Sequence, residues 1–180
     1  THTGLDDAFF RPAAYAQRHR IREVAGVVVG EGVRDFEVVA EGTALFPYDE
    51  VGEPLEPGEA FMRDVWPLRA ALKSRIDFGR TPEERKLRWY DHSMFFASRF
   101  RASATIAFAF VATHNHFAID RGQKIFNRSS PVLKFHEPIQ DELMFGVLAT
   151  LSSSCAAFWL RETGYLKGGG GEEAWADRME

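Results

Sequence analysis

The chain has 180 residues, 45% of them hydrophobic, so it can bury one substantial core. Its apolar runs are too short for a membrane span, and its first residues lack the pattern of a secretion signal. The one cysteine, Cys155, excludes an internal disulfide, and its apolar neighbours predict a buried, unreactive thiol. We therefore expect a soluble, cytoplasmic protein.

The net charge of −4 hides an uneven distribution. Residues 61–128 contain 13 Lys or Arg against 6 Asp or Glu, whereas the rest of the chain contains 9 against 20. Because salt screens each charge beyond roughly 10 Å, a local basic region can bind a polyanion whatever the total charge. Within this region Arg85, Lys86 and Arg88 are typical of a solvated helix face.

The first third of the chain predicts paired strands. The apolar run 27–29 and the strand-like segment 33–39 flank a glycine-bearing turn. This Gly30-x-Gly32 turn follows a strand, but no helix pattern follows it, so we do not expect it to bind a nucleotide cofactor. Segment 51–58 is rich in Gly, Pro and Glu and predicts an exposed loop.

The next segment predicts helices. From Pro57, apolar side chains recur at spacings of three and four through Ile76, which predicts a helix that ends before Gly79. Pro67 lies inside this span and should kink or divide the helix. The pattern of residues 81–84, Thr-Pro-Glu-Glu, is a capping box that predicts a second, short helix.

After Phe100 the apolar period falls to two, which predicts a strand. Segments 117–119 and 124–126 flank an Asp-Arg-Gly-Gln turn and predict a β-hairpin, and residues 131–135 predict one more strand.

The C-terminal part predicts one long helix. Apolar residues from Leu143 to Trp159 form a helical stripe that should face the core, and Gly164 can end the helix. The complete pattern predicts an α+β fold: a twisted, mostly antiparallel sheet with a mid-chain helix and a long C-terminal helix. We expect one domain over 1–166, followed by a flexible glycine-rich tail at 167–180.

Polar and cationic side chains gather in segment 111–134, and these are the groups that proteins use to bind DNA. Asn and Gln can pair with adenine and Arg with guanine, each good pair discriminating by ~1–3 kcal/mol. Lys and hydroxyl groups suit phosphates. The alternative is the polar face of an ordinary sheet. The candidate DNA-binding residues are Arg99, Arg101, Thr113, His114, Asn115, His116, Arg121, Gln123, Lys124, Asn127, Arg128, Ser129 and Ser130.

Two other functions are open alternatives. In a strand, His114 and His116 would point to one face and could share a metal ion, as in a metal-dependent nuclease or hydrolase. Two ligands leave a zinc or magnesium site incomplete, and His92 or His136 could complete it only through the fold. The chain could also be a protein-interaction domain that docks a partner through the helix carrying Phe158 and Trp159.

Several segments, in order from Thr3 to Gly171, carry a resemblance to a known family. They are Thr3–Phe9, Val29–Phe36, Leu45–Asp49, 111–134, Leu151–Ser153 and Phe158–Leu160. With these segments the chain resembles the C-terminal part of adenine-specific DNA methyltransferases, closest to the phage-growth-limitation type of bacterial phage-defence (BREX) systems.

The resemblance implies a target recognition domain that docks double-stranded DNA and presents the target to a separate catalytic domain. That domain of the parent would use S-adenosylmethionine to methylate adenine N6. Other defence-system proteins are possible partners. The Asn/Asp-Pro-Pro-aromatic motif with which adenine methylases hold the flipped base is absent, since no proline here follows Asn or Asp. We therefore expect the chain alone to bind DNA, without cofactor or catalysis.

Overall fold

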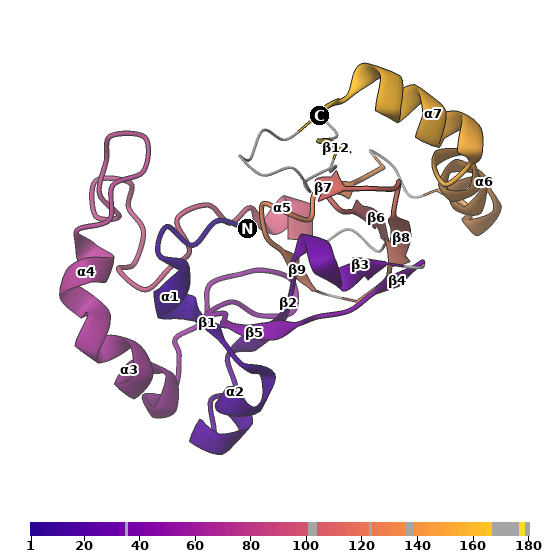
Figure 1. The fold of residues 1–180 in the computed structure, drawn as a ribbon. Helices are drawn as coiled ribbons and strands as arrows, with labels where there is room; N and C mark the ends of the chain where they lie inside the picture. Colours follow the sequence, from indigo (N-terminus) through magenta and orange to yellow (C-terminus); the bar gives the residue numbers. More distant parts are fainter. Residues whose placement is uncertain (35, 101–103, 123, 136–138, 167–176, 179–180) are drawn as a thin grey trace. The chain divides into compact units, whose positions relative to one another are not determined.

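The computed structural model describes residues 1–34, 36–100, 104–122, 124–135, 139–166 and 177–178 (Figure 1). The chain divides into two compact units, each assembled from segments distant in sequence. Unit 1 comprises residues 1–27, 40–101 and 123–125, and unit 2 comprises residues 28–39, 102–122 and 126–180. The predicted α+β class is confirmed, with mostly antiparallel strands, a mid-chain helix and C-terminal helices. A single recognition domain over 1–166 stays a prediction.

Unit 1 is built on a sheet with strand order β1-β5-β2-β9. Its strands β2 and β5 are antiparallel, with Ala25 opposite Ala44. The expected pairing of β2 with segment 33–39 is wrong, because that segment folds back on itself as strands β3 and β4. A positive φ of 66° at Phe36 makes this reversal possible. The elements of the first 45 residues are α1 (Asp6–Phe9), β1 (Phe10–Arg11), α2 (Ala13–His19), β2 (Val24–Val28), η1 (Gly30–Gly32), β3 (Val33–Arg34), β4 (Glu37–Val38) and β5 (Gly42–Leu45), of which η1, β3 and β4 belong to unit 2. The fourth strand of the sheet, β9 (Ile125–Phe126), comes from much later in the chain.

The predicted mid-chain helix is present and is divided at Pro67, as expected. It consists of α3 (Glu59–Val65), a 3-10 turn η2 (Trp66–Leu68) and α4 (Arg69–Lys73), followed later by the short α5 (Ala97–Phe100). Phe61 and Leu72 are fully buried in the core of unit 1. The apolar face ends sooner than predicted, because Ile76 lies beyond α4 and is 70% exposed.

The capping box is confirmed, but the helix after it is not. The Thr81 backbone N–H donates to the Glu84 carboxylate at 2.7 Å, and the Glu84 N–H donates back to Thr81 Oγ1 at 3.4 Å. Only turns follow, since Lys86 has a φ of 60° and so leaves the helical region.

Unit 2 contains antiparallel strands with the order β10-β6-β8, and Ile106 of β6 lies opposite Ile119 of β8. The predicted hairpin of segments 117–119 and 124–126 is wrong: β8 pairs with β6, whereas β9 belongs to the sheet of unit 1. The predicted strand at 131–135 is present as β10. Strands of this unit, besides β3 and β4, are β6 (Thr105–Phe108), β7 (Val111–Ala112), β8 (Phe117–Asp120), β10 (Val132–Leu133), β11 (Tyr165–Leu166) and β12 (Asp177–Arg178), with the further order β11-β12-β7.

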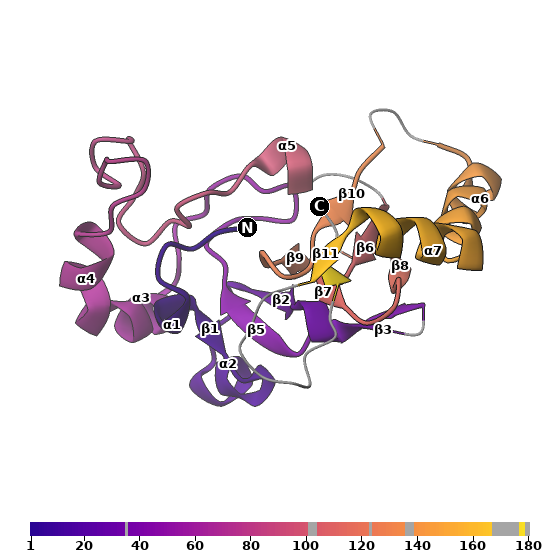
Figure 2. The same cartoon turned by 45° about the horizontal axis from the view of Figure 1, so that its top comes forward.

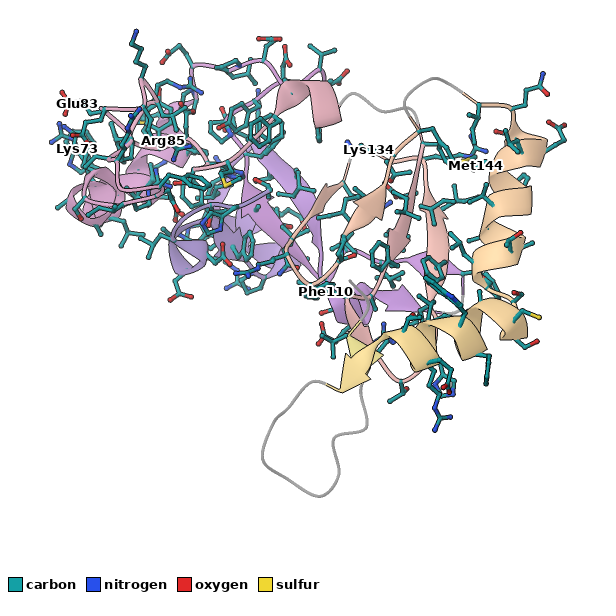
Figure 3. All side chains as sticks on the ribbon, turned by 90° about the horizontal axis from the view of Figure 1, so that it is seen from above. Lys73, Glu83, Arg85, Phe110, Lys134 and Met144 are labelled. Carbon is teal, nitrogen blue, oxygen red and sulfur yellow. The ribbon has the colours of Figure 1, made fainter. Side chains whose placement is uncertain are left out.

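The C-terminal helix is two helices, α6 (Asp141–Leu151) and α7 (Ser154–Thr163), which are bent by 57° relative to each other (Figure 2). The Ser153 hydroxyl accepts from the Ala156 N–H at 3.2 Å and so begins α7, which ends before Gly164 as predicted. Met144 is buried against the strands (Figure 3). The predicted tail at 167–180 lies outside the described residues except for the two that form β12.

The predicted core-facing stripe is only partly correct. Leu143, Phe158 and Trp159 are 59%, 68% and 63% exposed, and Cys155 is exposed instead of buried. In the described part of the chain, no single helix has the length and apolar character to cross a membrane; α6 and α7 satisfy that test only when the bent pair is counted together.

Candidate nucleic-acid interface

The polar segment after β7 lies on unit 2, and its first residues face solvent. The side chains of Thr113 and His114 are exposed, and Thr113 Oγ1 lies 3.0 Å from His114 Nδ1. The rings of His114 and His116 have their centroids 6.3 Å apart, so both imidazoles belong to the same part of the surface. This arrangement presents hydrogen-bonding groups outward.

Asn115 has a different role, because its amide is committed to the bend between the two C-terminal helices. Its Nδ2 donates to the Leu151 carbonyl at 2.6 Å and to the Ser153 carbonyl at 3.3 Å. The last carbonyls of a helix have no partner within the helix, so the bond to Leu151 satisfies a carbonyl at the end of α6, while the bond to Ser153 reaches the N-cap residue of α7. Asn115 thus fixes the position of α7 next to the exposed histidine.

A pocket of about 310 Å³ opens between the segment after β7 and α7. This volume lies at the lower end of the range typical of ligand sites, roughly 300–1,000 Å³. Its lining combines an aromatic ring, an imidazole, an amide and a guanidinium, and the described residues around it include no carboxylate. They are Ala112, Thr113, His114, Asn115, Ala157, Phe158, Leu160 and Arg161. We call this site the His114 pocket.

Phe158 and Arg161 are not among the candidate DNA-binding residues, and Phe158 was expected only in a helix that docks a protein partner. Both are exposed, and they are one helical turn apart on α7, so they share a face. Sequence spacing alone could not place them beside His114, because the two segments are more than 40 positions apart.

Three other candidates, Asn127, Ser129 and Ser130, form a turn that packs against η1. Asn127 Oδ1 accepts from both the backbone N–H and the hydroxyl of Ser129, each at 2.7 Å. Ser129 Oγ in turn accepts from the Gly30 N–H at 2.8 Å. Ser130 is fully buried. The side chains of Asn127 and Ser129 thus form hydrogen bonds inside unit 2, whereas the buried Ser130 hydroxyl has no hydrogen-bond partner among the described residues.

The candidate cations differ in how accessible they are. Arg121 is half-exposed and pairs with Asp141 at the start of α6, 2.7 Å away. Arg128 is exposed, and Lys124 is partly buried. Of Arg99 only the backbone is described, in α5; Arg101 and Gln123 lie outside the described residues.

The cations that were expected to form a solvated helix face are held in unit 1. Arg88 contacts Asp91 through two nitrogen atoms, at 2.7 and 3.0 Å, and also donates to the carbonyls of Leu55 and Pro47. Arg85 donates to the Ser93 carbonyl. The predicted helix face is therefore wrong; Lys86 alone of the three is exposed as expected, and it lies in a turn.

The described residues offer little to a metal ion. They contain no group of three or more His, Cys, Asp or Glu side chains placed to hold one. His92 is enclosed in unit 1, where its Nε2 donates to the Leu45 carbonyl at 2.8 Å, and burial lowers its pKa to about 4. His136 lies outside the described residues.

Comparison with known proteins relates the chain to a methyltransferase. No family model matches the chain. The chain is 35% identical, over 98% of its length, to the adenine-specific methyltransferase PglX of Streptomyces coelicolor, and it spans 16% of that protein. The chain is therefore homologous to a part of an adenine-specific methyltransferase.

Proposed function

We propose that the chain is the target recognition domain of an adenine-N6 DNA methyltransferase that acts in bacterial phage defence. The observation that carries this proposal is the 35% identity to part of an adenine-specific methyltransferase. The chain lacks the motif that holds a flipped adenine, so a recognition role accounts for it better than a catalytic one. Double-stranded DNA and the catalytic domain of the same parent would be its partners.

The His114 pocket supports this role by its chemistry. Phe158 and His114 offer rings on which a base or sugar can pack, and Arg161 offers a planar donor for phosphate or guanine. The described lining has no carboxylate that would repel a polyanion. We assign base and phosphate contacts to this pocket and additional phosphate contacts to Arg128, which is exposed on the same unit.

S-adenosylmethionine would bind elsewhere in the parent. In this chain the glycine turn at η1 does not fit the cofactor, since the Gly30 N–H already donates to Ser129 Oγ. A Cβ atom on Gly30 would lie 2.7 Å from the Ser129 carbonyl oxygen, so protein already fills the space next to the turn.

Binding to duplex DNA across a salt series tests the proposal. We expect the affinity of the 180-residue chain for a fluorescent duplex to fall steeply with salt, because bound phosphates release counterions. Replacing Arg161 and Arg128 by Ala should make the log–log slope shallower by about 0.9 for each phosphate that the protein no longer neutralises. Arg18→Ala is the matched control, since Arg18 is also an exposed arginine but lies on α2, outside the basic region.

The outcomes separate the alternatives. A shallower slope in the double variant with an unchanged slope in Arg18→Ala supports DNA docking by this surface. No binding at low salt contradicts the recognition role. Equal slopes in all variants would contradict the assignment of the contacts to unit 2.

A second candidate, protein docking, is favoured by exposed apolar side chains on α6 and α7. Leu143, Phe145, Phe158 and Trp159 are each more than half exposed. Contact with the catalytic domain of the parent would cover this surface. Trp159→Ala should then weaken association with the rest of the parent chain, measured by co-purification, without altering DNA affinity of the isolated chain.

A further inference from the structure

The turn that follows α4 presents the most exposed large apolar side chains that the structure describes. Phe78 is 79% exposed and Ile76 is 70% exposed. The chain leaves α4 as a loop that stands away from α3 and α4 (Figures 1 and 2). A Cβ atom on Gly79 would have no neighbour within 4 Å, so the tip of the turn protrudes.

The conformation of this turn is specific and costs free energy. The Asp77 and Arg80 backbones exchange hydrogen bonds, N to O, at 3.0 and 3.2 Å. Phe78 and Gly79 between them have φ values of 54° and 72°, the signs of a type I′ turn. Such turns favour Asn, Asp or Gly at both central positions, because a left-handed φ crowds a bulky side chain. Phe78 therefore breaks a local rule while making no core contact, which is typical of functional positions.

Hydrogen bonds hold the base of the turn. Arg75 is buried, and its guanidinium donates to the carbonyls of Leu72, Trp89 and Asp91 at 2.9 Å each, and to that of Thr3. Two residues later, Asp77 lies 3.2 Å from a ring nitrogen of His2. These hydrogen bonds would keep the turn in its conformation when the Phe78 ring inserts into a partner.

Several cationic side chains lie close to the turn in sequence. Arg80 is the last residue of the turn, and Lys73 and Lys86 are exposed on either side of it in sequence. Lys73, Glu83 and Arg85 lie at the same end of this unit (Figure 3). Two exposed carboxylates, Glu83 and Glu84, lie close in sequence, and Glu84 remains ionised in the capping box because its bonds to Thr81 lower its pKa. Residues 73–86 contain five Lys or Arg against three Asp or Glu, so the segment that carries the apolar tip has a net positive charge, which complements a polyanion.

We infer that Phe78, with Ile76 beside it, is a wedge that inserts into the base stack or minor groove of duplex DNA, while Arg80 and Lys73 contact the adjacent phosphates. Apolar wedges of this kind partly unstack a base step and let more protein contact the bent duplex. The inference rests on the proposed DNA-recognition function and adds a second contact, on unit 1.

The test compares binding of the 180-residue chain to two fluorescent duplexes of the same sequence, one fully paired and one with a single central mismatch. A wedge binds the mismatched duplex more tightly, because less stacking must be broken there. We expect Phe78→Ala to lose roughly ten-fold in affinity, or about 1.4 kcal/mol, together with the preference for the mismatch. Phe36→Ala is the matched control, since Phe36 is 68% exposed at a φ of 66° but belongs to unit 2, and it should bind as the wild type does.

A second variant excludes a structural role. Phe78→Gly relieves the left-handed strain, so its melting temperature should equal or exceed that of the wild type while its DNA affinity falls. A melting temperature well below the wild type, or wild-type affinity of Phe78→Ala for both duplexes, overturns the wedge. If Phe78→Ala binds both duplexes as the wild type does, the exposed turn is assigned to a protein contact instead, and the recognition function is not contradicted. Absence of DNA binding by the wild type, in contrast, overturns the recognition function itself.

Discussion

Ser129 Oγ accepts a hydrogen bond from the Gly30 backbone N–H at 2.8 Å, across 99 positions of sequence. The close approach leaves no room for a side chain on Gly30, whose Cβ would lie 2.7 Å from the Ser129 carbonyl oxygen. Unit 2 thus depends on a glycine for close approach of two backbones, not for binding a nucleotide.

Gly30→Ala should consequently lower the free energy of unfolding by about 2 kcal/mol, as overpacking does in well-packed sites. Urea denaturation measures this loss. Gly146→Ala is the control: a Cβ there meets no atom within 4 Å, and the residue lies inside α6, so alanine should add roughly 0.5–1 kcal/mol. Equal stability of the two variants would contradict the close approach.

Asn115 should behave as a structural residue more than as a base reader. In the wild type the carbonyl oxygens of Leu151 and Ser153 accept from the Asn115 amide. Asn115→Asp replaces that donor by a carboxylate, which faces the same two oxygens. Loss of both bonds and repulsion should lower stability by about 2 kcal/mol. Thermal unfolding of Asn115→Asp and of His114→Asn tests this, since His114 is exposed and its replacement should change stability by less than about 0.5 kcal/mol.

The stability of the chain should fall on mild acidification because of His92. Its pKa is about 4 in the folded chain, against an ordinary value of about 6.5 that applies after unfolding. Between these values the unfolded chain binds a proton that the folded chain excludes. The contribution of His92 to the free energy of unfolding is therefore fully present above pH ~6.5 and is lost as the pH falls towards ~4. The decline from this group is about 3 kcal/mol.

Two measurements isolate His92 from the carboxylates that titrate in the same range. Nuclear magnetic resonance of the imidazole should give a midpoint near pH 4 in the folded chain. Urea denaturation of His92→Gln between about pH 7 and pH 5 should show a flatter dependence on pH than the wild type. A normal midpoint near 6.5 would refute the enclosed, neutral imidazole.

Arg75 should be among the most sensitive positions of unit 1. Arg75→Met removes the donors to four carbonyls and should lower the free energy of unfolding by about 3 kcal/mol, because buried acceptors are left without partners. Arg75→Lys should recover little, since one ammonium cannot reproduce the planar fork of a guanidinium. Arg63→Met, at an exposed position of α3, should be within about 0.5 kcal/mol of wild type by urea denaturation.

Features governed by nearby residues were predictable from sequence. The divided helix around Pro67 follows from local periodicity and from the missing N–H of proline. The capping box of Thr81 and Glu84 follows from three-residue spacing. These patterns depend on neighbours within one or two helical turns.

Features governed by distant contacts were not predictable. The strand β8 has the composition of a hairpin arm, but tertiary packing pairs it with β6 instead of β9. The bend between α6 and α7 depends on Asn115, which lies 36 positions before Leu151. The His114 pocket is lined by two segments more than 40 positions apart, so Phe158 and Arg161 could not be assigned to it from periodicity.

The order of segments in the two units has an evolutionary consequence. The chain passes from one unit to the other after residues 27, 39, 101, 122 and 125, so neither unit is a contiguous stretch. A recombination breakpoint between residues 27 and 125 leaves each unit with pieces from two parents. Exchange of this region between homologues should therefore succeed only when the whole stretch is transferred, and chimaeras with internal junctions should be recovered rarely.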